Sequence, residues 1–344
     1  MESLNRALQN PCFDNGVYDH IIQAVSDFLA ANLDAEVSPN LASGVADDLS
    51  GVVNAVSSLS YLVPQANSQN LVASLLRVLK VLLRKHENRK AAGKECAPPI
   101  INLLKQSATV NPSIACECAN VLLNMCYDPR NIGHVLDAGG LEALVSMLHS
   151  GDVSTQACSL GALQSVCFAQ KGRECVRRGG AATKVVAFML SPDARVRTRA
   201  LGCVHNLSSD ASSIGEMRAA GALPPLIAML RSPSPEVCGA AAGTIQNMSR
   251  EPCCRQTLLS GGAVPPLADL LLGTDTRCQI SAAGALFNIL GPDVAAQDRE
   301  IFKTVLSDGI VLGALGSCLC GSPVLPPSTT ALSAPAPPRV PSHR

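Results

Sequence analysis

Tryptophan is absent from this sequence of 344 residues, and the other aromatic residues are scarce. Three tyrosines and six phenylalanines bring the aromatic content to only 3%. A protein that binds single-stranded nucleic acid without sequence preference uses aromatic side chains on which the bases stack. The composition therefore argues against a surface of that kind.

An excess of charge of either sign is lacking as well. Lysine plus arginine and aspartate plus glutamate each total 27, so the formal net charge is zero. A neutral chain has no overall field that draws it to a phosphate backbone or to an anionic membrane. The longest apolar run, 71–83, contains Arg77 and Lys80 and is shorter than the roughly 20 residues that cross a bilayer. We therefore expect neither a nucleic-acid partner nor a membrane partner.

Little in the sequence is typical of a secreted protein, a metal site or an active site. It opens with MESLNRALQN and not with the basic and then apolar segment of a secretion signal. We therefore expect a reducing, cytoplasmic compartment in which its fifteen cysteines are free thiols. The close cysteine pairs lack the two-residue spacing of zinc ligands, and the six histidines are scattered. We expect no metal, no cofactor and no enzyme activity.

One short segment recurs along the chain with a constant period. It reads NVLLNM, GALQSV, GCVHNL, GTIQNM and GALFNI at 120–125, 161–166, 202–207, 243–248 and 284–289. The fifth residues of these segments, which we call the ladder positions, are Asn124, Ser165, Asn206, Asn247 and Asn288. Each lies 41 residues after the one before it, and a period in this range predicts stacked helical repeats.

A second recurring unit precedes each copy. It combines a glycine stop with a short apolar helix, as in AGGLEALVSML and AAGALPPLIAML, and Gly139, Gly221 and Gly262 mark the turns. A polar joint such as SPDARV follows, where serine, aspartate and proline are typical of a helix start. The order predicts three helices in each repeat, with the ladder position on the third.

This pattern resembles the armadillo family, and residues 219–249 follow its order closely. The resemblance covers about 47–320 and implies an all-α, right-handed superhelical solenoid with a concave face. We expect a helical cap at 1–46, including a helix at 20–33, and about six repeats at 47–320, the last one incomplete. The proline-rich segment 321–344 predicts a disordered tail, and the incomplete last repeat indicates a truncated or alternatively ended form of a longer chain.

The resemblance also implies a binding groove. In armadillo proteins that bind extended peptides, third-helix asparagines line the concave face and hydrogen-bond the peptide backbone, since an amide offers both a donor and an acceptor. The alternative is that each asparagine only ties its own helix to the neighbouring loop. With Arg84 in the earliest copy at a period of 40, the candidate groove residues are Arg84, Asn120, Asn124, Ser165, His205, Asn206, Gln246, Asn247 and Asn288.

The positions one turn before the ladder depart from the family's nuclear import adaptors. Those adaptors carry tryptophan there, whereas this chain has Asn120 and then four glycines, at 161, 202, 243 and 284. Recognition of lysine-rich import signals through indole rings is therefore not expected. The glycines permit a close approach of the ligand or of a neighbouring helix, and close helix packing is the favoured interpretation.

A non-catalytic scaffold that holds a client protein segment in its groove is the function that the resemblance implies. A finer version is a cochaperone or assembly factor for a large complex such as a motor protein, because the armadillo part of cochaperones that also carry tetratricopeptide repeats is similar. The alternative is a regulator of a small GTPase, an exchange or dissociation factor, which an acidic groove would favour.

Overall fold

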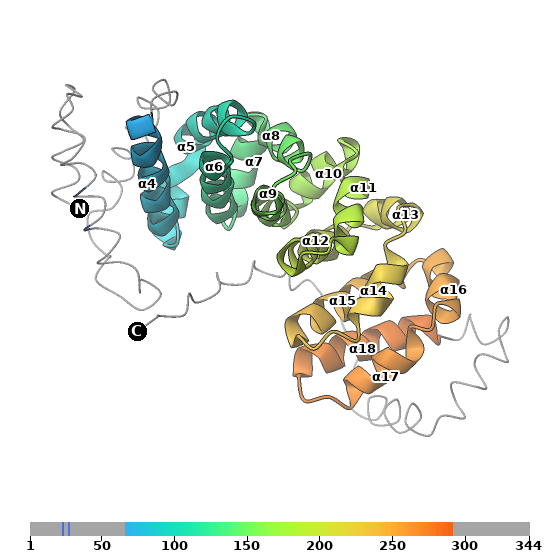
Figure 1. The fold of residues 1–344 in the computed structure, drawn as a ribbon. Coiled ribbons are helices and arrows are strands. Elements are labelled where there is room, and N and C mark those ends of the chain that lie inside the picture. The colour runs from blue at the N-terminus through green and yellow to red at the C-terminus, as the bar shows by residue number, and fades with distance from the viewer. Residues whose placement is uncertain (1–22, 24–26, 28–65, 292–344) are drawn as a thin grey trace. The chain divides into compact units, whose positions relative to one another are not determined.

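The computed structural model describes Gln23, Asp27 and residues 66–291, and every regular element in this part of the chain is a helix (Figure 1). The expected cap helix at 20–33 lies outside it except for Gln23 and Asp27, which are helical. The last, incomplete repeat and the tail at 321–344 also lie outside it. The helices are α4 (Ala66–Leu82), α5 (His86–Ser107), α6 (Pro112–Met125), α7 (Pro129–Asp137), α8 (Gly140–Met147), α9 (Val153–Val166), α10 (Gln170–Arg178), α11 (Ala181–Ala187), the 3-10 turn η1 (Phe188–Leu190), α12 (Ala194–Leu207), α13 (Ala211–Ala219), α14 (Leu223–Met229), α15 (Pro235–Met248), α16 (Pro252–Ser260), α17 (Val264–Leu271) and α18 (Thr276–Ile289).

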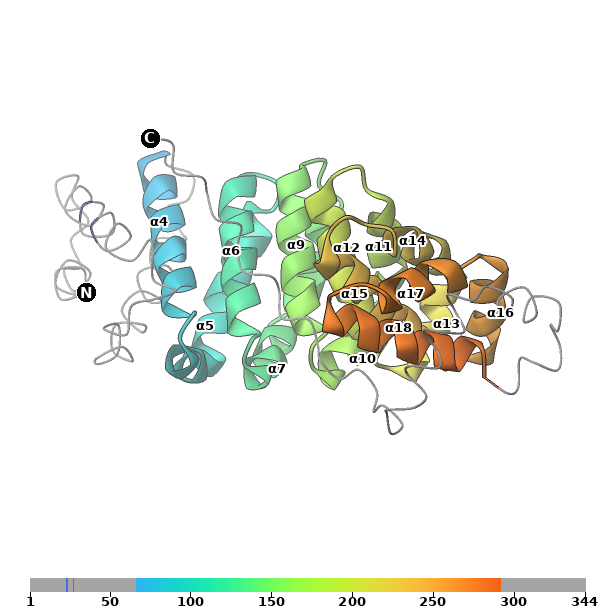
Figure 2. The same cartoon turned by 90° about the horizontal axis from the view of Figure 1, so that it is seen from below.

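The chain divides into two compact units, Met1–Cys175 and Val176–Arg344, with the boundary inside α10. In the first unit α4, α6 and α9 lie side by side, as Figure 2 shows, and each packs on the next. In the second unit α12, α15 and α18 pack on one another in the same order. Each unit is therefore a stack in which third helices contact third helices.

The three-helix repeat that the sequence predicts is present. Two short helices precede a third helix of 14 residues in α7–α9, α13–α15 and α16–α18, and α10–α12 follow the same order. In the earliest described repeat the single element α5 replaces the two short helices and bends at Gly93, whose φ is 38°. The period read from the sequence is thus the period of the helices.

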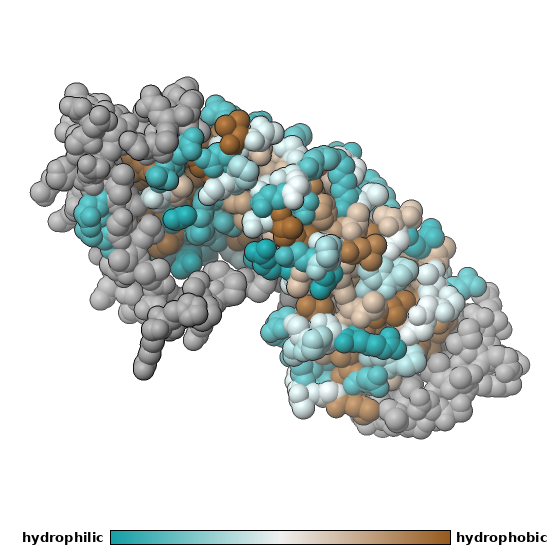
Figure 3. Space-filling model, viewed as in Figure 1, coloured by the Kyte–Doolittle hydropathy of each residue, from teal (hydrophilic) through white to brown (hydrophobic). Residues whose placement is uncertain are grey.

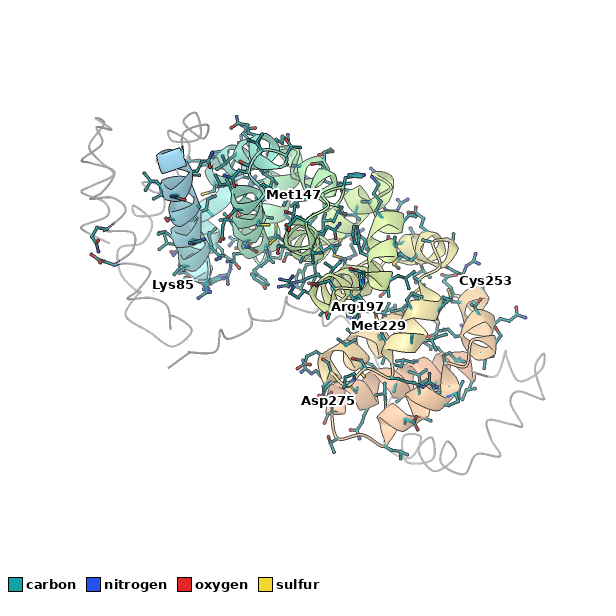
Figure 4. The ribbon with its side chains drawn as sticks, viewed as in Figure 1. Lys85, Met147, Arg197, Met229, Cys253 and Asp275 are labelled. Atoms are coloured by element: carbon teal, nitrogen blue, oxygen red, sulfur yellow. The ribbon has the colours of Figure 1, made fainter. Side chains whose placement is uncertain are left out.

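Polar side chains start each third helix at the same interval. The residues before α6, α9, α12, α15 and α18 are Asn111, Asp152, Asp193, Ser234 and Asp275, each accepting a hydrogen bond from a backbone N–H in the first turn. These N–H groups have no acceptor within the helix, so the cap satisfies them. Asp275 lies at the start of α18 in Figure 4.

Glycines end the first helix of each repeat. Gly139, Gly180, Gly221 and Gly262 all have a positive φ, between 65° and 81°. A side chain at this left-handed conformation would be strained, so glycine is the residue that turns the chain from the first helix into the second. The predicted turns at Gly139, Gly221 and Gly262 are confirmed.

Arginines cap the opposite ends of the third helices. Arg173 Nη1 donates to the carbonyl oxygens of Cys167 and Phe168, at 3.1 and 2.9 Å. Arg255 donates in the same way to Ser249 O and Arg250 O, at 2.7 and 3.1 Å. The last carbonyls of a helix lack intrahelical donors, and a cation there also interacts favourably with the helix dipole. The next repeat thus completes the end of each of these helices.

The N-cap interaction makes a testable contribution to stability. Asp152 accepts from Thr155 N and from Thr155 Oγ1, both at 2.7 Å. We expect Asp152→Ala to lower the free energy of unfolding by about 1 kcal/mol, because the first turn of α9 loses its acceptor. Asp152→Asn keeps an acceptor oxygen and is the matched control. Urea denaturation followed by circular dichroism checks this, and equal losses in both variants would contradict a capping role.

Candidate functional site

The ladder positions all lie in the last turn of a third helix. Asn124 is in α6, Ser165 in α9, Asn206 in α12, Asn247 in α15 and Asn288 in α18. Asn124 and Asn288 are partly exposed, whereas the other three are buried. The exposure of the ladder residue therefore differs from one repeat to the next.

The partly exposed asparagines bind the preceding third helix. Asn124 Nδ2 donates to Lys80 O of α4 at 3.0 Å, and Asn288 Nδ2 donates to Gln246 O of α15 at 3.0 Å. Both acceptors are in the last turn of their helices, where carbonyl oxygens have no intrahelical donor. Each of these asparagines therefore caps the helix of the repeat before it.

Serine hydroxyls extend this contact in the second unit. Asn247 Nδ2 donates to Ser208 Oγ at 3.0 Å, and Asn288 Nδ2 donates to Ser249 Oγ at 3.1 Å. The side chain of Asn247 is only 1% exposed, and its Oδ1 accepts from Arg250 Nη2 at 3.0 Å. Both polar atoms of Asn247 are therefore engaged inside the protein.

Asn206 and Ser165 lie in the interior as well. Asn206 is 2% and Ser165 5% exposed. The hydroxyl of Ser165 is buried and makes no hydrogen bond in the described part of the chain. A groove role for these two residues stays a prediction. Their burial gives it no support, because neither side chain reaches the surface.

Four of the five residues one position before the ladder are buried too, whereas Phe287, which precedes Asn288, is 61% exposed. Gln164, His205 and Gln246 are between 2% and 6% exposed. His205 Nδ1 lies 3.3 Å from Thr244 Oγ1, and that hydroxyl donates to Ala240 O at 2.7 Å. If the hydroxyl hydrogen is used in this way, Oγ1 accepts from the Nδ1-protonated tautomer of His205. His205 and Gln246, both candidate groove residues, thus join neighbouring repeats.

Glycine makes room for these side chains. A Cβ atom at Gly243 would lie 2.9 Å from His205 Cε1, and one at Gly284 would lie 2.2 Å from Gln246 Nε2. At these two positions the expected close approach of neighbouring helices is confirmed. Each of these two glycines thus faces a side chain of the preceding repeat.

Arg84 does not occupy a ladder position. Helix α4 ends at Leu82, and Arg84 is exposed in the turn that follows. After this turn Asn88 Nδ2 donates back to Leu82 O at 2.6 Å. The expected period of 40 therefore fails in the earliest described repeat.

An equivalent bond in the next repeat gives the true register. Asn131 Nδ2 donates to Met125 O at 3.1 Å, as Asn88 does to the last residue of α4. The two donors are 43 residues apart, because the connections around α5 differ in length from those of later repeats. Val81, which is buried, is the residue equivalent to Asn124.

A polar face of α6 remains open beside α4. Glu117, Asn120 and Asn124 follow one another at the three- and four-residue spacing that places them on one side of a helix. Glu117 binds Arg77 Nε at 3.2 Å and Lys80 Nζ at 2.9 Å, both from α4. We call these five residues the α4–α6 polar face. Arg77 and Glu117 are 40 residues apart, close to the repeat period. This spacing could have predicted the ion pair from the sequence, but it was not recognised there.

Asn120 is the residue of the α4–α6 polar face whose side-chain amide is available to a ligand. It is partly exposed, and in the part of the chain that the structure describes its amide makes no hydrogen bond to another residue. An amide in this state can donate to and accept from a ligand. Asn120 and Asn124 are the two candidate groove residues on this face, beside the charged residues, and their groove role stays a prediction.

The arginines at the start of α12 serve their own repeat. Arg195 pairs with Asp193 at 3.3 Å, and Arg197 Nη1 donates to Ser191 O and Pro192 O at 2.7 and 2.8 Å (Figure 4). These contacts fix the joint before α12. Figure 3 shows hydrophilic and hydrophobic residues interspersed on the face in view.

Two further observations bear on chemistry. Among the described residues no group of three or more histidine, cysteine, aspartate or glutamate side chains is placed to hold a metal ion. No helix in the described part is long and apolar enough to cross a membrane.

Comparison with known sequences identifies the repeat. The family model described as Armadillo/beta-catenin-like repeat matches residues 128–168, 211–250 and 254–291. These matches coincide with α7–α9, α13–α15 and α16–α18, and the repeat α10–α12 between them has the same helices without a match. No curated protein sequence matches the chain.

Solved structures of designed proteins share the fold. An engineered protein is 25% identical, with a TM-score of 0.62, and the match covers 68% of this chain and 96% of that one. A designed armadillo repeat protein is 20% identical, with a TM-score of 0.62 over 68% of this chain and 99% of that one. Another, solved in complex with the peptide (KR)4, is 21% identical, with a TM-score of 0.60 over 68% and 99%. The expected all-α solenoid fold is confirmed.

Close packing at the glycines can be tested by adding one methyl group. We expect Gly284→Ala to lower the free energy of unfolding by about 1–3 kcal/mol, because its Cβ would overlap Gln246. Part of this loss should disappear when Gln246→Ala is added, so a double-mutant cycle measures the contact. Gly215→Ala in α13 is the control, since nothing lies within 4 Å of its Cβ position. Additive losses at 284 and 246 would contradict the contact.

Proposed function

The chain is an armadillo-repeat protein, and from that premise we propose that it is a non-catalytic scaffold that binds an extended segment of a client protein on its third helices. The fold is typical of binding scaffolds, and within each unit every further repeat adds one more third helix to the surface. The Asn120 amide carries the proposal: it is partly exposed, makes no hydrogen bond to another described residue, and lies between other polar side chains of the same helix face.

The ladder asparagines contribute to this surface unequally. Asn247 is buried with both polar atoms engaged, so its main contribution is to hold α15 against α12. Asn124 and Asn288 each use a donor on the preceding helix but keep part of their side chains exposed. The proposed binding residues are therefore Asn120 and Asn124 in the first unit and Asn288 in the second.

Charge on the α4–α6 polar face supports a client segment that carries acidic residues. Arg77 and Lys80 share the single carboxylate of Glu117, and the side chain of Arg77 is 50% exposed. An added carboxylate can thus bind the exposed guanidinium without displacing Glu117. One designed armadillo neighbour was solved with the basic peptide (KR)4, and we propose the same mode of binding with the opposite charge preference.

Finer roles remain predictions. A cochaperone or assembly-factor role has no support beyond the resemblance of the repeats. Regulation of a small GTPase would be favoured by an acidic groove, whereas cations outnumber carboxylates on the α4–α6 polar face. We propose a protein client and not nucleic acid, no catalytic turnover, and the cytoplasm as the compartment.

A peptide selection tests the scaffold function. Random twelve-residue peptides displayed on phage are selected on the full chain, and the selected peptides are assayed against two variants that add the same bulk and charge. Asn120→Glu blocks the α4–α6 polar face and repels an acidic client, whereas Asn102→Glu adds glutamate at an exposed asparagine of α5. We expect affinity to fall at least about tenfold for Asn120→Glu, the equivalent of about 1.4 kcal/mol, and to stay unchanged for Asn102→Glu.

The sequences of the selected peptides test the charge preference separately. Enrichment in aspartate and glutamate, with binding weakened by added salt, agrees with a role for Arg77 and Lys80. Equal binding of the peptides to both variants would place their site elsewhere and contradict the proposal.

A further inference from the structure

Two cysteines of neighbouring third helices face each other in the first unit. Cys116 lies in α6 and Cys158 in α9. Cys116 Sγ donates to Thr155 Oγ1 of α9 at 3.7 Å, and Thr155 lies one turn before Cys158 on that helix. The two thiols are close enough for each to shift the pKa of the other. Because α6 packs along α9, the two sulfur atoms are held together by helices and not by loops.

Exposure separates this pair from most other cysteines. Both thiols are partly exposed, whereas eight of the twelve described cysteines are buried. A small oxidant in solution can therefore reach Cys116 and Cys158. Cys253, which is exposed on α16 (Figure 4), has no second thiol described as hydrogen-bonded to it.

The surroundings also divide the chemical roles. Hydrogen bonding from the Cys158 thiol lowers the pKa of Cys116, against burial and the nearby carboxylates of Asp152 and Glu117. The same hydrogen bond, together with burial, raises the pKa of Cys158. Cys116 is thus the better nucleophile and Cys158 holds the proton.

The buried thiols show the contrast. Burial alone raises the pKa of Cys126 to about 12, and it raises that of Cys167 to about 12 against the opposing charge of Arg173. Thiols in such surroundings are poor nucleophiles at neutral pH.

We propose that Cys116 and Cys158 form an oxidation site at which a hydroperoxide, such as hydrogen peroxide, produces a reversible disulfide between α6 and α9. The Cys116 thiolate attacks one peroxide oxygen, which breaks the O–O bond and, with a proton from solvent, releases water. The sulfenic acid that remains on Cys116 is attacked by Cys158 sulfur. An S–S bond forms, and the sulfenic hydroxyl leaves as a second water with the Cys158 proton.

The disulfide cross-links two successive repeats. Its ends are 42 residues apart in the sequence, so it restricts the unfolded chain and raises thermal stability. A dithiol reductant reverses the bond by thiol–disulfide exchange.

Peptide mapping tests the site on the full chain. Protein is treated with a few equivalents of hydrogen peroxide, the remaining thiols are alkylated, and a non-reducing digest is analysed by mass spectrometry. We expect one dominant cross-linked peptide pair, containing Cys116 and Cys158 and lacking two hydrogen atoms, which dithiothreitol removes. Disulfides distributed over other cysteines, or irreversible oxidation of Cys116 without a cross-link, would overturn the proposal.

Single-cysteine variants separate the roles and check the effect on stability. Oxidised wild-type protein should melt several degrees higher than reduced protein, and Cys158→Ser should abolish the rise and leave Cys116 as a sulfenic acid that dimedone labels. Cys253→Ser is the matched control and should behave as the wild type. If the serine variants fail to fold, as judged by circular dichroism, the wild-type peptide map still decides between the outcomes.

Discussion

The carbonyl oxygens at the end of each third helix need donors, and the structure obtains them from the next repeat. Asn124 and Asn288 donate to Lys80 O and Gln246 O of the preceding third helices. A helix end buried without such donors is destabilised by about 1–3 kcal/mol for each unsatisfied group. The asparagine that recurs along the chain is therefore first of all a contact between repeats. The glycines one turn earlier serve the same contact, since they admit His205 and Gln246 from the preceding helix.

This constraint bears directly on where a partner can bind. A side chain that is buried with both polar atoms engaged, as Asn247 is, cannot bind a ligand unless it first gives up a contact that holds two repeats together. Among the residues that the structure describes, none makes a hydrogen bond that restricts the amide of Asn120 in this way. Most third helices have glycine one turn before the ladder position. Helix α6 has Asn120 there, with the ion pairs of Glu117 beside it. We therefore propose that Asn247 of α15 serves stability, whereas Asn120 of α6 serves recognition.

The repeat could be predicted from the sequence because its strongest signals are local. Glycine at 139, 221 and 262 and a polar cap before each third helix depend on backbone geometry within a few residues, and both recur at the period of 41. Arg84 was misplaced because the period is 43 across α5, where the kink at Gly93 and a longer connection replace the usual turn. The burial of Asn206 and the exposure of Asn120 could not be read from residue type, because both are asparagines on the same kind of helix. Which face of a helix stays open depends on the packing of its neighbours.

Nuclear magnetic resonance of the asparagine side-chain amides, with and without a selected peptide, tests the central claim most directly. With nitrogen-15 at these amides, the account predicts that the Nδ2 hydrogens of Asn247 exchange slowly with solvent and keep their chemical shifts when peptide binds, because they are buried and donate to Ser208. Those of Asn120 should exchange quickly and shift. Fast exchange at Asn247 together with a peptide-dependent shift there, and none at Asn120, would contradict the division between asparagines that join repeats and the one that is free to bind.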